Sequence, residues 1–123
     1  HIETYNLSKV CPPGFATKII ASPGSLESTR RPDIPAMISS WKDSLSDSGS
    51  IDVYFVDAKN ILNEYLYDRL SITEVDSHLY NNGSISIHDM FEIRNTLISL
   101  GFKVRDSGFL STDHKIGFVH AEK

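Results

Sequence analysis

Residues 51–60, IDVYFVDAKN, are the stretch that most constrains the fold of this chain. Apolar side chains alternate along its first half, and β-branched and aromatic residues dominate it, as is typical of strands. Its dense apolar content predicts a central strand over residues 51–59, covered on both faces of a sheet. The strand ends in an acid, Asp57, followed two places later by Lys59. These charges are either a solvated strand end with a weak ion pair or part of an active site.

Periodicity and turn signals predict the remaining elements. Strands are expected over residues 15–22, 33–41, 102–105 and 115–121, with Pro35 placing the second of these at an edge or bulge. Helices are expected over 60–70 and from Ser86 to Gly101, where Ser86 is the N-cap and Asp89 completes a capping box. This order predicts an α/β or α+β fold, a central mixed sheet flanked by helices.

Length and composition limit the class of protein. With 123 residues, 40% of them hydrophobic and 23% charged, the chain is expected to form a single domain over residues 1–123. It begins at His1 rather than a methionine, and we expect it to be a fragment of a larger protein. No apolar run approaches the roughly 20 residues of a membrane span, and no leader is apparent. The single cysteine, Cys11, indicates a reducing, cytoplasmic location.

The acids suggest a metal site. Asp33 lies at the start of the expected strand 33–41, and Asp57 and Lys59 lie at the end of the next strand. A hairpin between these strands would bring the three side chains to one point, because residues two apart on a strand share a face. Two carboxylates and a backbone carbonyl are hard oxygen ligands suited to Mg²⁺ or Mn²⁺. A metal-bound water could then attack a phosphodiester, with the lysine stabilising the developing charge.

The motifs RPDIPAM and IDVYFVDAKN together resemble the PD-(D/E)XK nuclease superfamily, of the restriction-endonuclease-like kind. The resemblance implies an αβββαβ core, although its first helix is not apparent here. It implies metal-dependent hydrolysis of DNA, or of RNA, with Mg²⁺ or Mn²⁺ held by Asp33, Asp57 and the Ala58 carbonyl, and with Lys59 catalytic. The helix with its glutamate is expected either before residue 1 or replaced in its role by Glu3 or Glu27.

Other interpretations remain open. Arg30 and Arg31 either contact phosphate or lie in a solvated loop, and with a net charge of −4 any nucleic-acid surface must be local. Partners are expected to be nucleic acid, DNA before RNA, and other domains of a larger protein, with no membrane. A non-catalytic nuclease-like or unrelated α/β module that binds a protein partner is one alternative. A PIN/NYN-type ribonuclease fragment is another, since YFVDAKNIL resembles the first strand of that family.

Overall fold

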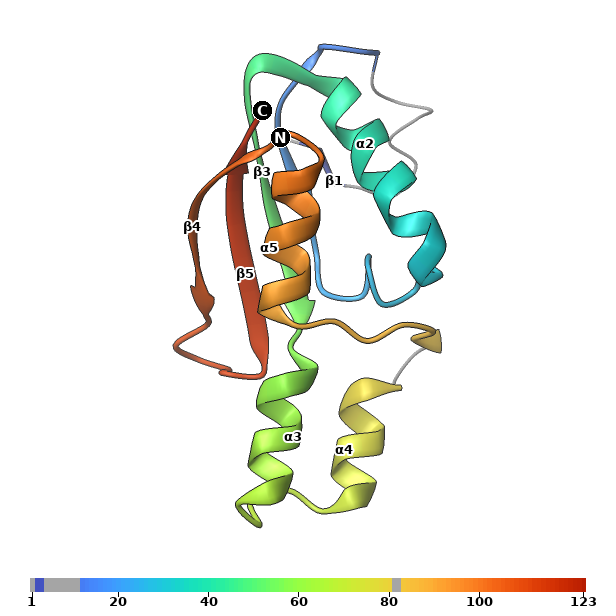
Figure 1. Cartoon of the computed structure of the whole chain (residues 1–123), viewed down its shortest axis with the longest axis vertical. Coiled ribbons are helices and arrows are strands. Elements are labelled where there is room, and N and C mark those ends of the chain that lie inside the picture. Colours follow the sequence, from blue (N-terminus) through green and yellow to red (C-terminus); the bar gives the residue numbers. More distant parts are fainter. Residues whose placement is uncertain (1, 4–11, 81–82) are drawn as a thin grey trace.

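The computed structural model describes residues 2–3, 12–80 and 83–123 (Figure 1). Within them, one mixed sheet holds five strands in the spatial order β1-β2-β3-β5-β4. The strands are β1 (Ile2–Glu3), β2 (Ala16–Ala21), β3 (Leu45–Val56), β4 (Lys103–Phe109) and β5 (Ile116–Glu122). β1, β2 and β3 are parallel, whereas β5 runs antiparallel to both of its neighbours, β3 and β4. The expected mixed sheet with helical cover is confirmed.

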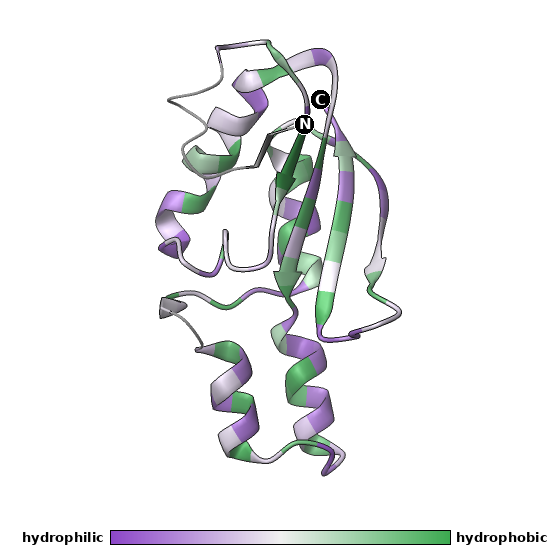
Figure 2. Ribbon diagram, turned by 180° about the vertical axis from the view of Figure 1, so that it is seen from behind, coloured by the Kyte–Doolittle hydropathy of each residue, from purple (hydrophilic) through white to green (hydrophobic). Residues whose placement is uncertain are grey.

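Helices connect the strands. A 3₁₀ turn, η1 (Arg31–Asp33), and helix α2 (Ile34–Ser44) carry the chain from β2 to β3, and helix α5 (Met90–Ser99) precedes β4. Figure 1 shows α2 and α5 on the same face of the sheet, and Figure 2 shows the strands from the opposite side. Helices α3 (Ala58–Leu66) and α4 (Ile72–Leu79) form a hairpin that extends beyond the end of β3.

The main core lies between the sheet and helices α2 and α5. Alternate residues of β3, including Val53 and Phe55, are fully buried, and so are Ile38 of α2 and Leu97 of α5. The intervening β3 residues, such as Tyr54, are only half-buried. Both faces of this strand were expected to be covered, but only one face is buried and the other is half-buried. A smaller cluster joins the two helices of the hairpin: Ala58, Ile61, Val75 and Leu79.

The strand predicted over 33–41 is wrong, because this segment is helix α2. Proline is tolerated in the first turn of a helix, where its missing N–H would have had no partner, and Pro35 occupies that turn. Ile34, Ile38 and Trp41 are buried at helical spacing. Because α2 is a crossover between parallel strands, no hairpin joins β3 to this segment. The restriction-endonuclease-like αβββαβ core is not supported.

The other expected elements are present with shifted ends. Strands expected over 15–22, 102–105 and 115–121 are β2, β4 and β5, and the helix expected over 60–70 is α3. The central strand ends at Val56, and the last helix begins at Met90 with Asp89, rather than Ser86, as its N-cap. Helix α4 was not predicted. Cys11 lies outside the described residues.

Candidate functional site

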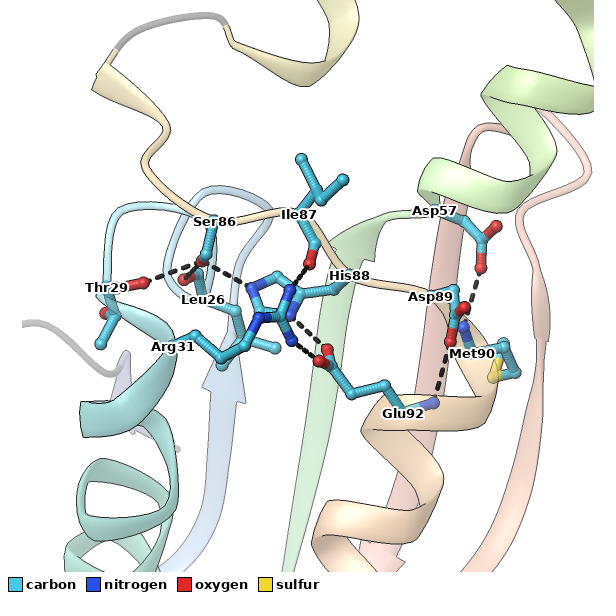
Figure 3. A network of polar contacts seen from close by, with 10 residues as sticks. All are labelled: Leu26, Thr29, Arg31, Asp57, Ser86, Ile87, His88, Asp89, Met90 and Glu92. Carbon is cyan, nitrogen blue, oxygen red and sulfur yellow. Dashed lines mark hydrogen bonds and ion pairs between the residues drawn. The ribbon is translucent and has the colours of Figure 1, made fainter.

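The candidate site is the edge of the sheet where the parallel strands β2 and β3 end. The two strands pair as far as Ala21 and Val53, so the loop 22–30 and the residue after β3, Asp57, emerge from neighbouring strands. Ligands in open α/β sheets bind beyond the carboxyl ends of the strands. Residues 86–89 cross this edge before α5 begins (Figure 3). A single β-bridge joins His88 to Asp57.

Asp57 is the structural anchor of this edge. Its side chain is buried, with the residue 1% exposed. Oδ1 accepts a hydrogen bond of 2.8 Å from the Asn60 N–H and caps α3, while Oδ2 accepts one of 2.9 Å from the Met90 N–H at the start of α5. Both carboxylate oxygens therefore receive backbone donors, which satisfy a buried negative charge and complement the positive ends of two helices. The acid at the end of β3 is explained by its capping of two helices.

A buried serine and histidine tie this edge together. Ser86 Oγ lies 2.7 Å from His88 Nε2, 3.0 Å from the Leu26 carbonyl oxygen and 2.8 Å from that of Thr29 (Figure 3). On the other side of the ring, His88 Nδ1 lies 2.5 Å from Glu92 Oε1. The network therefore joins the loop after β2 to the first turn of α5.

His88 is a neutral imidazole at neutral pH. Its burial, followed by the positive charge of Arg31, lowers the pKa of His88 to about 4. Arg31 itself forms an ion pair with Glu92 and donates a hydrogen bond to the Ile87 carbonyl. The guanidinium thus holds the crossing segment in place from the solvent side.

Glu27 is the one buried acid of this edge whose hydrogen bonding is incomplete within the described part of the chain. It is 3% exposed, and Oε2 accepts a hydrogen bond of 2.8 Å from the Gly24 N–H. Oε1 is buried and has no hydrogen-bond partner among the described residues. Burial raises the pKa of Glu27, and the hydrogen bond from the Gly24 N–H opposes that rise. An unsatisfied buried carboxylate oxygen is costly, and it is suited to a donor supplied by a ligand.

A pocket of about 410 Å³ opens beside this glutamate. We call it the Glu27 pocket; its lining is Pro23, Gly24, Glu27, Ser28, Val56, Ser77, His78 and Ser84. Most of these residues come from the loop after β2, from the end of β3 and from α4. The pocket therefore lies at the carboxyl edge of the sheet, where the fold places ligands.

The residues predicted to form a metal site have other surroundings. Asp33 is exposed at the start of α2 and makes no side-chain cap hydrogen bond, and Lys59 is exposed on α3. The Ala58 N–H donates a hydrogen bond to the His88 carbonyl. Among the described residues, no group of three or more His, Cys, Asp or Glu side chains could hold a metal ion. Arg30 and Arg31, the predicted phosphate contacts, are both exposed, and Arg31 contacts Glu92 and the Ile87 carbonyl.

Local sequence patterns do not reveal the roles of Ser86 and His88 in joining distant segments. Ser86 was interpreted as a helix N-cap, but its hydroxyl contacts residues about sixty positions earlier, and no local pattern encodes such a contact. For Glu27, one signal was available, because an acid shortly after a parallel strand lies at the edge where ligands bind.

Across the described residues, no helix is long and apolar enough to cross a membrane.

Comparison with known proteins places the fold. No family model matches the chain, and no curated protein shows significant sequence similarity to it. Solved structures do match. A SAM-dependent methyltransferase from Archaeoglobus fulgidus shares 11% identity over 98% of this chain and 65% of its own, with a TM-score of 0.67. An O-methyltransferase family 2 protein from Planctomyces limnophilus, in complex with apigenin, shares 20% identity over 93% of this chain and 32% of its own, with a TM-score of 0.66.

A third similar structure has SAH bound. Magnesium protoporphyrin IX methyltransferase from Synechocystis, with bound SAH, shares 20% identity over 89% of this chain and 46% of its own, with a TM-score of 0.60. The chain thus spans 32% to 65% of the length of these proteins. At such identities the similarity establishes the fold alone, a Rossmann-like α/β fold of the kind found in methyltransferases.

These findings correct the functional predictions. The structural neighbours include many methyltransferases, and the resemblance to PD-(D/E)XK nucleases is wrong. The predicted metal-dependent nuclease function and the predicted cofactors, Mg²⁺ or Mn²⁺, are therefore wrong as well. The PIN/NYN-type ribonuclease fragment and the partner-binding nuclease-like or unrelated module are likewise not supported. The nucleic-acid partner and the cytoplasmic location stay predictions.

Proposed function

We propose that this chain is part of an S-adenosylmethionine-dependent methyltransferase domain. The observation that carries the proposal is the strand arrangement, in which an antiparallel strand, β5, is inserted between β3 and β4 at the end of a parallel set. Structures of S-adenosylmethionine-dependent methyltransferases superimpose on nearly the whole described chain. We therefore expect the complete protein to be an enzyme.

The Glu27 pocket fits one part of such a cofactor. S-adenosylmethionine and its product S-adenosylhomocysteine carry hydrogen-bond donors on the ribose, the adenine and the amino acid. Glu27 Oε1 is a buried acceptor that has no donor among the described residues. It lies beside a pocket at the carboxyl ends of parallel strands, where an acid can accept a hydrogen bond from a ribose hydroxyl. When bound, S-adenosylmethionine supplies an electrophilic methyl group on a sulfonium.

The surrounding residues would fix this acceptor in place. The Glu27 carbonyl accepts hydrogen bonds from the Ile85 and Ser86 N–H groups, at 2.7 and 3.1 Å. Ser86 is held in turn by His88, and the Gly24 N–H occupies the second carboxylate oxygen. Because the acceptor is held from both sides, little side-chain freedom is lost when a ligand donates to it.

The test is a calorimetric titration of S-adenosylhomocysteine into the parent protein, Glu27→Gln and Glu64→Gln. We expect saturable binding by the parent and about tenfold weaker binding by Glu27→Gln, because the charged acceptor is lost. Glu64→Gln is the matched control, since Glu64 lies on α3 outside the Glu27 pocket, and should bind as the parent does.

Two outcomes would contradict the proposal. One is no saturable binding of S-adenosylhomocysteine by the parent up to about 1 mM, which corresponds to roughly −4 kcal/mol. The other is equal affinity in the parent and in Glu27→Gln, provided that circular dichroism shows both to be folded. Binding without a role for Glu27 would mean that the adenosyl group lies elsewhere.

A further inference from the structure

A second hollow lies away from the Glu27 pocket, between α3, α5 and the end of β4. We call it the α3–α5 pocket; it has a volume of about 600 Å³ and shares no lining residue with the Glu27 pocket. Its volume falls within the range of roughly 300–1,000 Å³ that is typical of sites for small molecules. Its lining is Asp57, Lys59, Asn60, Asn63, Met90, Phe91, Arg94, Asn95, Ile98 and Phe109.

One part of the α3–α5 pocket is apolar and exposed. Phe91 and Ile98 lie on α5, seven residues apart, and are 76% and 52% exposed. Phe109, at the end of β4, is 40% exposed. The core-facing residues of the same helix are Ile93 and Leu97, so α5 buries one face and presents a second apolar face to solvent. Grouped apolar side chains around a hollow are typical of a ligand site.

The polar part of the pocket carries excess positive charge. Lys59 and Arg94 both line it, and neither forms an ion pair with any described residue. The acid in the lining, Asp57, is buried and has both oxygens occupied by backbone N–H groups. It is therefore poorly placed to bond either cation. The two cations are available to an anionic group, while amides such as Asn63 offer further donors.

We propose that the α3–α5 pocket binds a small organic anion with an aromatic or aliphatic body. Its carboxylate or sulfonate would pair with Lys59 and Arg94, and its body would cover Phe91, Ile98 and Phe109. The proposal is independent of methyl transfer, because it rests on residues that the Glu27 pocket does not use.

Two probes that differ in one charge test this proposal. The anion is 8-anilinonaphthalene-1-sulfonate, and its neutral counterpart is N-phenyl-1-naphthylamine, which has the same rings without the sulfonate. Fluorescence titrations should show one saturable site for the anion, with about tenfold weaker binding of the neutral probe. Arg94→Gln and Lys59→Gln should each weaken binding of the anion several-fold and leave the neutral probe unaffected.

The control variant is Lys103→Gln, which removes the same charge from an exposed residue outside the pocket. It should bind both probes as the parent does. Amide chemical shifts in a ¹⁵N–¹H spectrum locate the probe, and the largest changes are expected at Asn63, Asn95 and Ile98. The proposal is overturned if both probes bind the parent equally, if Arg94→Gln and Lys59→Gln behave like Lys103→Gln, or if the shifts cluster at another surface.

Discussion

Replacing Asp57 with alanine tests whether this acid is a structural cap. The substitution removes both acceptors of a buried side chain at once, leaving the Asn60 and Met90 N–H groups without their partners. These donors belong to the first turns of α3 and α5, so the variant weakens the starts of two helices that pack on different clusters. A metal-site interpretation predicts the opposite, an intact fold with lost metal binding.

The size of the effect follows from the contacts. Losing a helix N-cap costs about 0.5–2 kcal/mol. Leaving a buried donor unsatisfied costs about 1–3 kcal/mol, and hydrogen bonds to a charged acceptor lie at the upper end. For two donors we expect Asp57→Ala to lower the free energy of unfolding by about 3–5 kcal/mol. That is a large share of the roughly 5–15 kcal/mol that stabilises a typical domain.

The assay is urea denaturation followed by circular dichroism, with Asp33→Ala as the matched control. Asp33 is also the residue before a helix, but its side chain is exposed and caps nothing. We expect Asp33→Ala to lie within about 0.5 kcal/mol of the parent. If Asp57→Ala loses less than about 1 kcal/mol, or no more than Asp33→Ala, the capping role is refuted.

Three further predictions concern the same fold. The pKa of His88 is lowered from 6.5 to about 4, so between these pH values the unfolded chain binds more protons than the folded protein. The contribution of His88 to the free energy of unfolding is therefore complete above pH 6.5 and is lost as the pH falls toward 4. Urea denaturation should show the parent losing up to about 2 kcal/mol more than His88→Gln between pH 6.5 and 5, and parallel pH profiles would contradict this. Gly117→Ala should cost about 1–3 kcal/mol of stability, since its Cβ would lie 2.7 Å from the buried Phe55 ring. Gly108→Ala should cost less in the same assay, because its Cβ would lie 3.3 Å from the Phe118 ring. Ser71→Ala should cost about 1 kcal/mol by removing the capping box of α4, and an unchanged denaturation midpoint would refute that.

Much of the sheet could be predicted from local pattern. The alternation over residues 51–56, the helical spacing over 60–70 and the β-rich segments near the C-terminus all correspond to observed elements. Helix α2 was missed because Pro35 was taken as a strand-edge signal, although Ile34, Ile38 and Trp41 already had helical spacing. That one error turned a parallel crossover into a hairpin, and with it produced a nuclease-like core.

The site was less predictable than the fold. Asp57 was predicted as a catalytic and metal-binding acid, but a sequence does not state which donors will meet a carboxylate, and here they are backbone N–H groups from two helices. Glu27 was named only as a substitute metal ligand, whereas its burial and unpartnered oxygen depend on the loop after β2 folding back. The contacts of Ser86 with Leu26 and Thr29 join distant segments, which local periodicity cannot encode.

The most direct test of the central claim, an adenosyl ligand beside Glu27, is a ¹⁵N–¹H titration of the parent with S-adenosylhomocysteine. Gly24 donates to the Glu27 carboxylate and therefore reports on it. We predict the largest shifts at Gly24, Glu27 and Ser28, their loss in Glu27→Gln, and no displacement of a probe held in the α3–α5 pocket. An absence of saturable shifts, or shifts confined to the residues of the α3–α5 pocket, would contradict the account.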